Sequence, residues 1–475
     1  MYPLKKCGEI KAVSAAEVSD SPLGIGFEKL DRGVFNPEPA YDKIAALGVK
    51  WVRIQSGWAR TEQQTGVYDF RWLDDIVDNL IRRGLEPWMC LCYGNGLYDE
   101  DAAKVFGAVG CPPIKTDEQK KAWRRYVAET VRHYRGRVTW FEIWNEPDGP
   151  WAWKHGPNGT EYGEFAKATA AAIREGSPEA KVIGGTFCTT HMDWIYDMFE
   201  TGCAADLDAL CYHGYLVDET YSLGQKYRTI RELARRYNPA MELIQGEVGT
   251  QSRPDGAGAL RQGCWSPEKQ AKFAARHLVA HVAAGMKLVS YFTSVDMVEA
   301  LKGRVGDKAS YMDFGYFGVL GADFDENGIA TGNYTPKPSY RTLQVLASIF
   351  RERPERIEIP VFLDTYFFYS PQMLQPEDGW RDLLSCGFRL AGNCPVWIYW
   401  KPADIVTTSY EGTLTVEVIA EPSKLKLADL KTGEVYKLPE SMIEASGRAT
   451  LYLKNLPLRD YPLMLIFDDF DSYMA

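Results

Sequence analysis

The sequence of 475 residues is poor in the groups that hold metal ions and cofactors. Its six histidines are scattered along the chain, and its ten cysteines include no CxxC pair. Zinc sites need such ligands at close spacing, and no glycine-rich phosphate-binding loop follows a predicted strand. We therefore expect neither a metal ion nor an organic cofactor.

Long apolar segments are also missing. No stretch reaches about 18 apolar residues, the length that spans a bilayer. The first segment, "MYPLKKCGEIKAVSAAEVSD", lacks the apolar centre of a secretory signal. The cysteines lie mostly in apolar runs such as "WMCLCYG", where reduced core thiols are found. These observations predict no membrane partner and a cytoplasmic location, or a secreted protein if a leader was removed.

Positive charge is in deficit, because 64 acidic residues face 54 basic ones and give a net charge of −10. Such a surface repels a phosphate backbone, which excludes nucleic acid as the expected partner. Aromatic residues are abundant instead, with 14 Trp, 27 Tyr and 20 Phe. Their flat apolar faces suit stacking on sugars, so the expected partner is an oligosaccharide or glycoside. The oligomeric state stays open.

Residues 24–353 alternate short apolar runs with longer amphipathic ones, a pattern typical of strand–helix units in a parallel sheet. The strand candidates are residues 24–30, 51–55, 85–92, 138–146, 181–187, 207–215, 241–247 and 287–293. Eight strands, each followed by a helix, predict an α/β fold, the (β/α)₈ TIM barrel. The active site of such a barrel lies at the C-terminal ends of its strands.

The pattern changes after residue 353. Short β-rich runs separated by turns, from "VFLDTYFFYS" to "PLMLIFDD", predict an appended C-terminal β-sandwich over residues 354–475. We expect the N-terminal segment, residues 1–23, to add a strand to this sandwich around "EIKAVSAA". No low-complexity linker separates the two parts, so rigid packing is expected.

Two glutamates end strands of the predicted barrel: Glu146 follows the fourth and Glu247 the seventh. A glutamate at a strand end is commonly a solvated loop residue. Here both lie at the mouth of one barrel, and two opposed carboxyl groups can cleave a glycosidic bond. One protonates the leaving oxygen, and the other attacks or activates water.

Other residues near these ends each have two interpretations. Arg53, in the second strand, either contacts substrate or is structural, with Glu142 as its expected partner inside the barrel. His213 is either a core histidine or a site residue, and Tyr215 shares its side of the strand by alternation. Trp151, like Trp153, either packs beneath a loop or offers a face to a sugar.

Several motifs resemble those of a known clan of enzymes. "WFEIWNEPDGPWAW", "IQGE", "CYHGY" and "RIQSGWARTEQQTGVYDFRWLDDIVD" resemble clan A retaining glycoside hydrolases, whose acid/base and nucleophile lie on strands four and seven. Within the clan, "YFTSVDMVEA", "FGYFGVLGADFDENG" and "TPKPSYRTLQVLASIF" are similar to glycoside hydrolase family 39, the β-xylosidase and α-L-iduronidase family. The resemblance covers residues 24–350, and the family also carries the sandwich.

The resemblance implies that Glu146 is the acid/base and Glu247 the nucleophile. Asn145 would bond the sugar 2-hydroxyl, and Asp296 would line the sugar subsite with His213 and Tyr215. The sequence departs from the clan's motifs at two places, so the identity of the sugar stays open. The nucleophile motif is Gln-Gly-Glu-Val-Gly, and Tyr291 stands where many clan members have tryptophan. The expected substrate-binding residues are Arg53, Asn145, Trp151, His213, Tyr215, Tyr291 and Asp296.

We therefore expect a retaining glycosidase that removes terminal sugars by a two-glutamate double displacement, with β-xylosides first. An endo-acting polysaccharide hydrolase of the same clan is the nearest alternative, because the sequence does not distinguish a groove from a pocket. A non-catalytic carbohydrate-binding barrel would lack a carboxylate. A metal-dependent isomerase or an aldolase would need clustered His and Asp ligands or a lysine at a strand tip.

Overall fold

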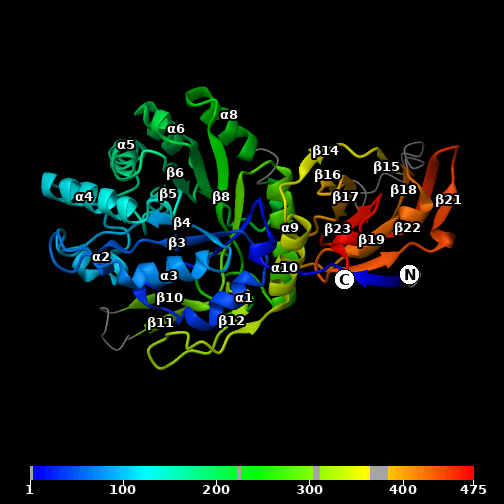
Figure 1. Cartoon of the computed structure of the whole chain (residues 1–475), viewed down its shortest axis with the longest axis horizontal. Helices are drawn as coiled ribbons and strands as arrows, with labels where there is room; N and C mark the ends of the chain where they lie inside the picture. Colours follow the sequence, from blue (N-terminus) through cyan, green and yellow to red (C-terminus); the bar gives the residue numbers. More distant parts are fainter. Residues whose placement is uncertain (1–3, 222–225, 303–310, 364–382) are drawn as a thin grey trace.

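The computed structural model describes residues 4–221, 226–302, 311–363 and 383–475, and its first part is a closed barrel of eight parallel strands (Figure 1). Each of these strands lies within or beside one of the eight segments predicted from the sequence, and the predicted (β/α)₈ fold is confirmed. The barrel strands are β2 (Leu23–Gly26), β3 (Trp51–Gln55), β4 (Glu86–Leu91), β5 (Trp140–Ile143), β6 (Lys181–Phe187), β7 (Ala209–His213), β8 (Glu242–Val248) and β9 (Leu288–Tyr291).

Helices surround this barrel (Figure 1). Those of the described residues are α1 (Tyr41–Ala45), α2 (Trp58–Thr61), α3 (Arg71–Ile81), α4 (Asp117–His133), α5 (Gly159–Gly176), α6 (Met192–Glu200), α7 (Glu219–Tyr221), α8 (Tyr227–Tyr237), α9 (Pro267–Ala283) and α10 (Pro338–Ile349). Three long helices begin at side-chain caps: Thr116 before α4, Asn158 before α5 and Ser266 before α9 each accept a backbone N–H of the first turn. Such caps satisfy donors that a helix leaves unpaired at its start.

The C-terminal part consists of antiparallel sheets, as predicted. A seven-stranded sheet has the order β1-β20-β19-β23-β17-β16-β14, and a four-stranded sheet the order β15-β18-β22-β21. Their bounds are β1 (Lys5–Glu9), β14 (Glu355–Ile357), β15 (Val361–Leu363), β16 (Leu384–Leu390), β17 (Cys394–Trp400), β18 (Glu411–Ile419), β19 (Lys426–Asp429), β20 (Glu434–Lys437), β21 (Ile443–Ala445), β22 (Thr450–Arg459) and β23 (Leu463–Ile466). Of the predicted strand at 361–370, residues 364–370 lie outside the described residues.

The N-terminal strand β1 pairs with β20, and the Ala475 N–H donates to the Glu9 carbonyl at 2.9 Å, so the two ends of the chain meet beside this sheet. It lies slightly before the segment "EIKAVSAA" where a strand was expected. Four short strands extend loops of the barrel: β10 (Met297–Lys302), β11 (Tyr311–Gly315), β12 (Leu320–Gly321) and β13 (Thr335–Pro336).

Helices α9 and α10 lie between the barrel and the sheets (Figure 1). From α9, Arg276 forms a buried two-point ion pair with Glu219, at 2.7 and 2.8 Å, and donates to the Ala403 carbonyl at 2.7 Å. The indole of Trp400 donates to the same Glu219 at 2.8 Å. Because an unpaired buried charge is costly, these contacts fix the position of the C-terminal sheets against the barrel.

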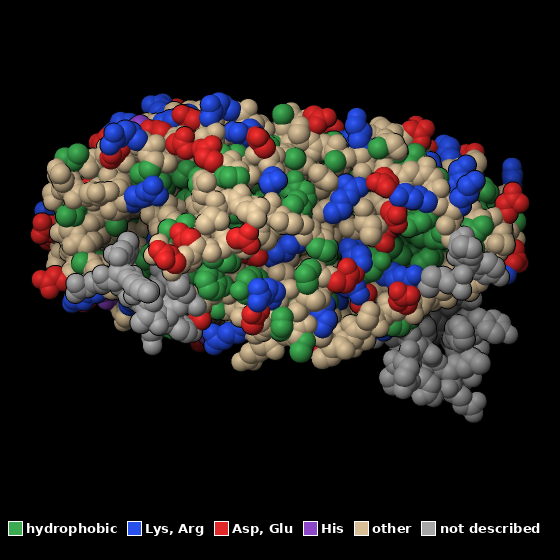
Figure 2. All heavy atoms as spheres, turned by 90° about the horizontal axis from the view of Figure 1, so that it is seen from below, with side chains coloured by type: hydrophobic (Ala, Val, Ile, Leu, Met, Phe, Trp, Pro, Cys, Tyr) green, Lys and Arg blue, Asp and Glu red, His purple; other side chains and the backbone are tan. Residues whose placement is uncertain are grey.

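The floor of the barrel is apolar. Its buried side chains are Trp88, Ile183, Ala209, Cys211, Ile244 and Leu288. The outer surface is mixed, and on the face in Figure 2 Lys and Arg side chains alternate with Asp and Glu side chains along the molecule. Within residues 4–221, 226–302, 311–363 and 383–475, no helix is long and apolar enough to cross a membrane.

Candidate active site

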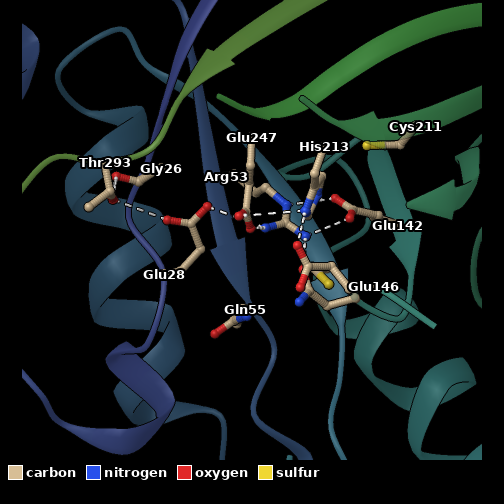
Figure 3. Close-up of polar contacts among 12 residues, drawn as sticks. Gly26, Glu28, Arg53, Gln55, Glu142, Glu146, Cys211, His213, Glu247 and Thr293 are labelled. Carbon is tan, nitrogen blue, oxygen red and sulfur yellow. Dashed lines mark hydrogen bonds and ion pairs between the residues drawn. The ribbon is translucent and has the colours of Figure 1, made fainter. Parts of the chain in front are cut away.

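Arg53 lies at the centre of the polar residues in the barrel mouth (Figure 3). Its side chain comes from β3, is fully buried, and binds Glu142 at two points: Nε to Oε2 at 2.9 Å and Nη2 to Oε1 at 2.6 Å. The predicted pairing of these two residues is thus confirmed. Burial alone would raise the pKa of Glu142, but the charge and hydrogen bonds of Arg53, together with the charge of His213 and the hydrogen bond from Trp88, outweigh burial and lower it. Asn145 completes this side, since its Oδ1 accepts from Arg53 Nη2 at 2.8 Å.

Glu247, at the end of β8, is held through both carboxylate oxygens. Arg53 Nη1 binds Oε1, and the Tyr215 hydroxyl donates to Oε2 at 2.6 Å. Burial and the charge of Glu247 raise the pKa of Tyr215 well above its ordinary value. The Tyr215 phenol therefore keeps its proton and acts as a hydrogen-bond donor. Together with Arg53, it fixes the orientation of the Glu247 carboxylate.

Glu146 is held from the other side of the mouth. His213 Nδ1 lies 2.9 Å from its Oε1, and the indole of the half-exposed Trp151 donates to Oε2 at 2.6 Å. The backbone of Glu146 has φ of 49°, and that of Trp144 has φ of 64°. A left-handed conformation at two large residues is strained and persists only where surroundings enforce it, commonly at functional sites.

Asp148 helps to hold the backbone of Trp144 and Glu146 in this conformation. This buried carboxylate accepts the backbone N–H groups of Cys188, Thr189 and Thr190 at 2.9, 2.7 and 3.2 Å. These bonds tie the loop after β5 to the loop after β6. The turn that carries Glu146 is thus fixed by a neighbouring strand.

His213 links the two glutamates. Its Nδ1 lies 3.5 Å from Glu247 Oε2 as well as close to Glu146, and one oxygen of each carboxylate lies within 4.8 Å of the others and of a ring nitrogen. Burial opposes a charge on the imidazole, but Glu247 and Glu146 outweigh burial and raise the pKa of His213 well above its ordinary value. When both carboxylates are ionised, they therefore favour a proton on the imidazole between them.

The local sequence explains how β7 and β8 bring these residues together. The pairing register shifts between Tyr212 and His213, so that His213 stands opposite Glu247. Such bulges re-aim side chains beside active sites. A side chain at Gly246 would place Cβ 2.5 Å from Cys211 Sγ, so only glycine permits this close approach. The glycine of the Gln-Gly-Glu motif is thus required for packing next to the Glu247 carboxylate.

Glu28, just beyond β2, was not predicted as a site residue. It is 1% exposed, and its Oε1 lies 3.4 Å from Arg53 Nη1 while Oε2 accepts from Thr293 Oγ1 at 3.3 Å (Figure 3). Burial raises the pKa of Glu28 to about 7, with the nearby Glu247 adding to the rise and Arg53 opposing it. Its position near the C-terminal end of the first predicted strand could have indicated that it is a site residue.

Two predicted binding residues have other surroundings. Tyr291 is fully buried in the hydrophobic core, and its neighbour Phe292 is the one whose ring contacts Tyr215, at 6.2 Å between centroids. Asp296 is buried, accepts from the Gly318 N–H at 2.9 Å and pairs with Lys337 Nζ at 2.7 Å. The structure brings together Arg53, Asn145, Glu146, Trp151, His213, Tyr215 and Glu247.

The fold also assembles groups that could hold a metal ion, which the spacing along the sequence did not reveal. Glu146, His213 and Glu247 form one such group. The second comprises Glu142, Cys211 and His213. His213 Nδ1 already faces oxygens of Glu146 and Glu247, and Arg53 already pairs with Glu247. The first group therefore fits an acid/base site better than a cation site.

Comparison with known proteins places this geometry in a family. A family model described as glycosyl hydrolases family 39 matches residues 43–356. A β-xylosidase of Caldicellulosiruptor saccharolyticus is 26% identical over 340 residues, which are 65% of this chain and 64% of that protein. The chain thus spans less than two thirds of the length of this relative.

Solved structures share the fold. A family 39 glycoside hydrolase from the gut symbiont Bacteroides cellulosilyticus WH2 superposes with a TM-score of 0.68 at 16% identity, over 97% of this chain and 83% of that one. A monomeric β-xylosidase from Caulobacter crescentus CB15 gives 0.59 at 18% identity, over 96% and 97%. Since the family model covers most of the barrel and the strands that carry both glutamates, the chain belongs to glycosyl hydrolase family 39.

Proposed function

We propose that this protein is a retaining glycoside hydrolase that removes terminal β-linked sugars, with β-xylosides as its preferred substrates. The observation that carries the proposal is the closeness of Glu146 and Glu247, whose nearest oxygens lie within 4.8 Å. Retaining enzymes place their two carboxyl groups about 5–5.5 Å apart, whereas inverting enzymes leave ~6.5–9.5 Å for a water molecule. The short separation favours double displacement.

In the first step Glu247 attacks the anomeric carbon while Glu146 gives its proton to the leaving oxygen. The C–O bond to the leaving group breaks as the bond to Glu247 forms, which yields a glycosyl-enzyme. Arg53 and Tyr215 support this step because they fix the Glu247 carboxylate before attack. His213 stabilises the carboxylate that Glu146 becomes once its proton has left, because its Nδ1 lies 2.9 Å from Glu146 Oε1.

In the second step Glu146 takes a proton from water, and the resulting hydroxide displaces Glu247 from the sugar. Two substitutions at one carbon leave its configuration unchanged. The Asn145 side-chain oxygen is occupied by Arg53, so its amide nitrogen is the group left to donate to the sugar 2-hydroxyl. Trp151, half exposed above Glu146, offers a face to the leaving sugar.

The β-xylosidase relative supports β-xyloside as the first substrate to test. Nitrophenyl β-xyloside, β-glucoside, β-galactoside and α-L-arabinoside should be compared with xylan, on which an endo-acting hydrolase of the same clan would be faster. A 2-fluoro derivative of the best glycoside should then inactivate the enzyme, and mass spectrometry should find the sugar on Glu247.

Glu247→Ala should abolish turnover, while Glu242→Ala, on the same strand but at its far end, is the matched control and should keep it. Sugar binding without turnover of any substrate would indicate a non-catalytic barrel. A label on a residue other than Glu247 would refute the assignment of the nucleophile.

A further inference from the structure

A cavity lies at the opposite end of the barrel from the glutamates. It has a volume of about 470 Å³ and is bordered by the first residues of β8, by Lys287 just before β9, and by α8. The other wall comes from Arg353, Arg356 and Phe388, in and beside β14 and β16 of the seven-stranded sheet. The cavity is therefore built by two parts of the fold together.

The lining of this cavity is strongly basic. Five cationic side chains border it, whereas Glu242 is the one acidic residue of the lining. The five are Arg231, Arg235, Lys287, Arg353 and Arg356. A local excess of positive charge is unexpected in a chain with a net charge of −10. Like charges held together at one place repel each other, so this arrangement calls for an anion.

The contacts of these cations leave much of their charge uncompensated. Arg231 donates to the carbonyls of Ala284 at 2.6 Å and Gly285 at 3.5 Å, and Arg356 donates to those of Ile357 and Gly387 at 3.0 and 2.6 Å. Carbonyl groups orient a guanidinium but carry no full negative charge. Burial lowers the pKa of Arg231, and the charge of Arg235 lowers it further.

The remaining three cations have weak partners. Arg235 pairs with Glu232 at 3.4 Å, Lys287 with Glu242 at 3.5 Å, and Arg353 with Asp20 at 3.4 Å. These distances are long and the groups are partly exposed, and such surface pairs contribute little. A ligand with two or more negative charges would meet several of these cations at once.

From this arrangement we propose that the cavity binds a small phosphate-bearing anion, either inorganic phosphate or a phosphate monoester. Guanidinium groups match phosphate because their fork of N–H donors bonds two of its oxygens. The volume is in the range of small-ligand pockets, which admits a monoester of a single sugar. Bound there, the anion would link α8 to β14 and thereby join the barrel to the C-terminal sheet.

Isothermal titration of the full chain tests this site, with sodium phosphate, glucose 6-phosphate and glucose as probes at constant ionic strength in chloride. Saturable binding of both phosphates, and none of glucose, is expected. The double variant Arg231→Met/Arg356→Met should weaken binding at least tenfold, whereas Arg236→Met, on the same helix but outside the cavity lining, should not change it.

A second measurement is the melting temperature, which bound phosphate should raise in the wild type and in Arg236→Met but not in the double variant. If the double variant fails to fold, Arg235→Met tests the same site, because its side chain is 54% exposed and its loss disturbs no core; it should weaken binding several-fold. Equal affinity in the wild type and these variants, or no saturable binding of either phosphate, would overturn the proposal. None of these outcomes depends on glycosidase activity.

Discussion

Tyr215 and Arg53 bind opposite oxygens of Glu247: the Tyr215 hydroxyl donates to Oε2 at 2.6 Å, and Arg53 Nη1 pairs with Oε1. A hydrogen bond to a charged group contributes about 1.5–3 kcal/mol, and each ~1.4 kcal/mol in the barrier changes a rate about tenfold. Tyr215→Phe should therefore lower kcat/KM of the best nitrophenyl glycoside by about 10- to 100-fold.

The matched control is Tyr291→Phe, since the Tyr291 hydroxyl is buried and has no hydrogen-bond partner among the described residues. This variant should keep kcat/KM within about twofold. If Tyr291→Phe lowered kcat/KM as much as Tyr215→Phe, Tyr291 would belong to the substrate site, as the sequence predicts.

Glu28 should make stability depend on pH. Its folded pKa of about 7 lies above its ordinary value of 4.5, so the folded chain retains a proton that the unfolded chain has released. The stabilisation is complete below pH 4.5 and is lost as the pH rises through 7. Glu28→Gln cannot ionise, so the melting temperature of the variant minus that of the wild type should be more positive at pH 8 than at pH 5.

The same measurement on Glu118→Gln, an exposed position of α4, controls for general effects of losing a carboxylate. Its difference from the wild type should be the same at both pH values. A constant difference for Glu28→Gln as well would mean that Glu28 is ionised across this range.

The charges in the barrel mouth predict activity without a divalent ion. Arg53 and His213 already bind the carboxylates that a metal would need. Dialysis against EDTA should leave turnover of the nitrophenyl glycoside unchanged. A loss of activity that zinc, calcium or magnesium restores would contradict this prediction.

Much of the barrel follows from the sequence because strand–helix alternation repeats eight times. The pairing of Arg53 with Glu142 was also predictable, because a carboxylate inside a barrel strand needs a buried cation. Which side chain at the end of β9 reaches the site was not predictable, because a shift of one residue turns a side chain to the other face of the strand. For that reason Phe292, and not Tyr291, contacts Tyr215.

The presence of Glu28 in the site could not be predicted from the sequence for another reason. Its contacts with Arg53 and Thr293 join residues 25 and 265 positions away, and no local pattern encodes contacts across a closed barrel. The basic cavity could not be predicted from the sequence either, because α8 and β14, which both border it, are far apart in the chain. Spacing along the sequence predicts elements, while packing between them decides which charges meet.

The last prediction concerns the stereochemistry of the product. If Glu247 forms a glycosyl-enzyme, the first sugar released from a β-glycoside must be the β-anomer, which proton NMR distinguishes before mutarotation. Glu146→Ala should lose most activity, yet azide should restore turnover, because this small anion attacks the glycosyl-enzyme without needing a base. The azide product should be the β-glycosyl azide, while Glu247→Ala should give the α-glycosyl azide if azide replaces the nucleophile. An initial α-sugar from the wild type would show inversion, and the closeness of Glu146 and Glu247 would then need an explanation other than double displacement.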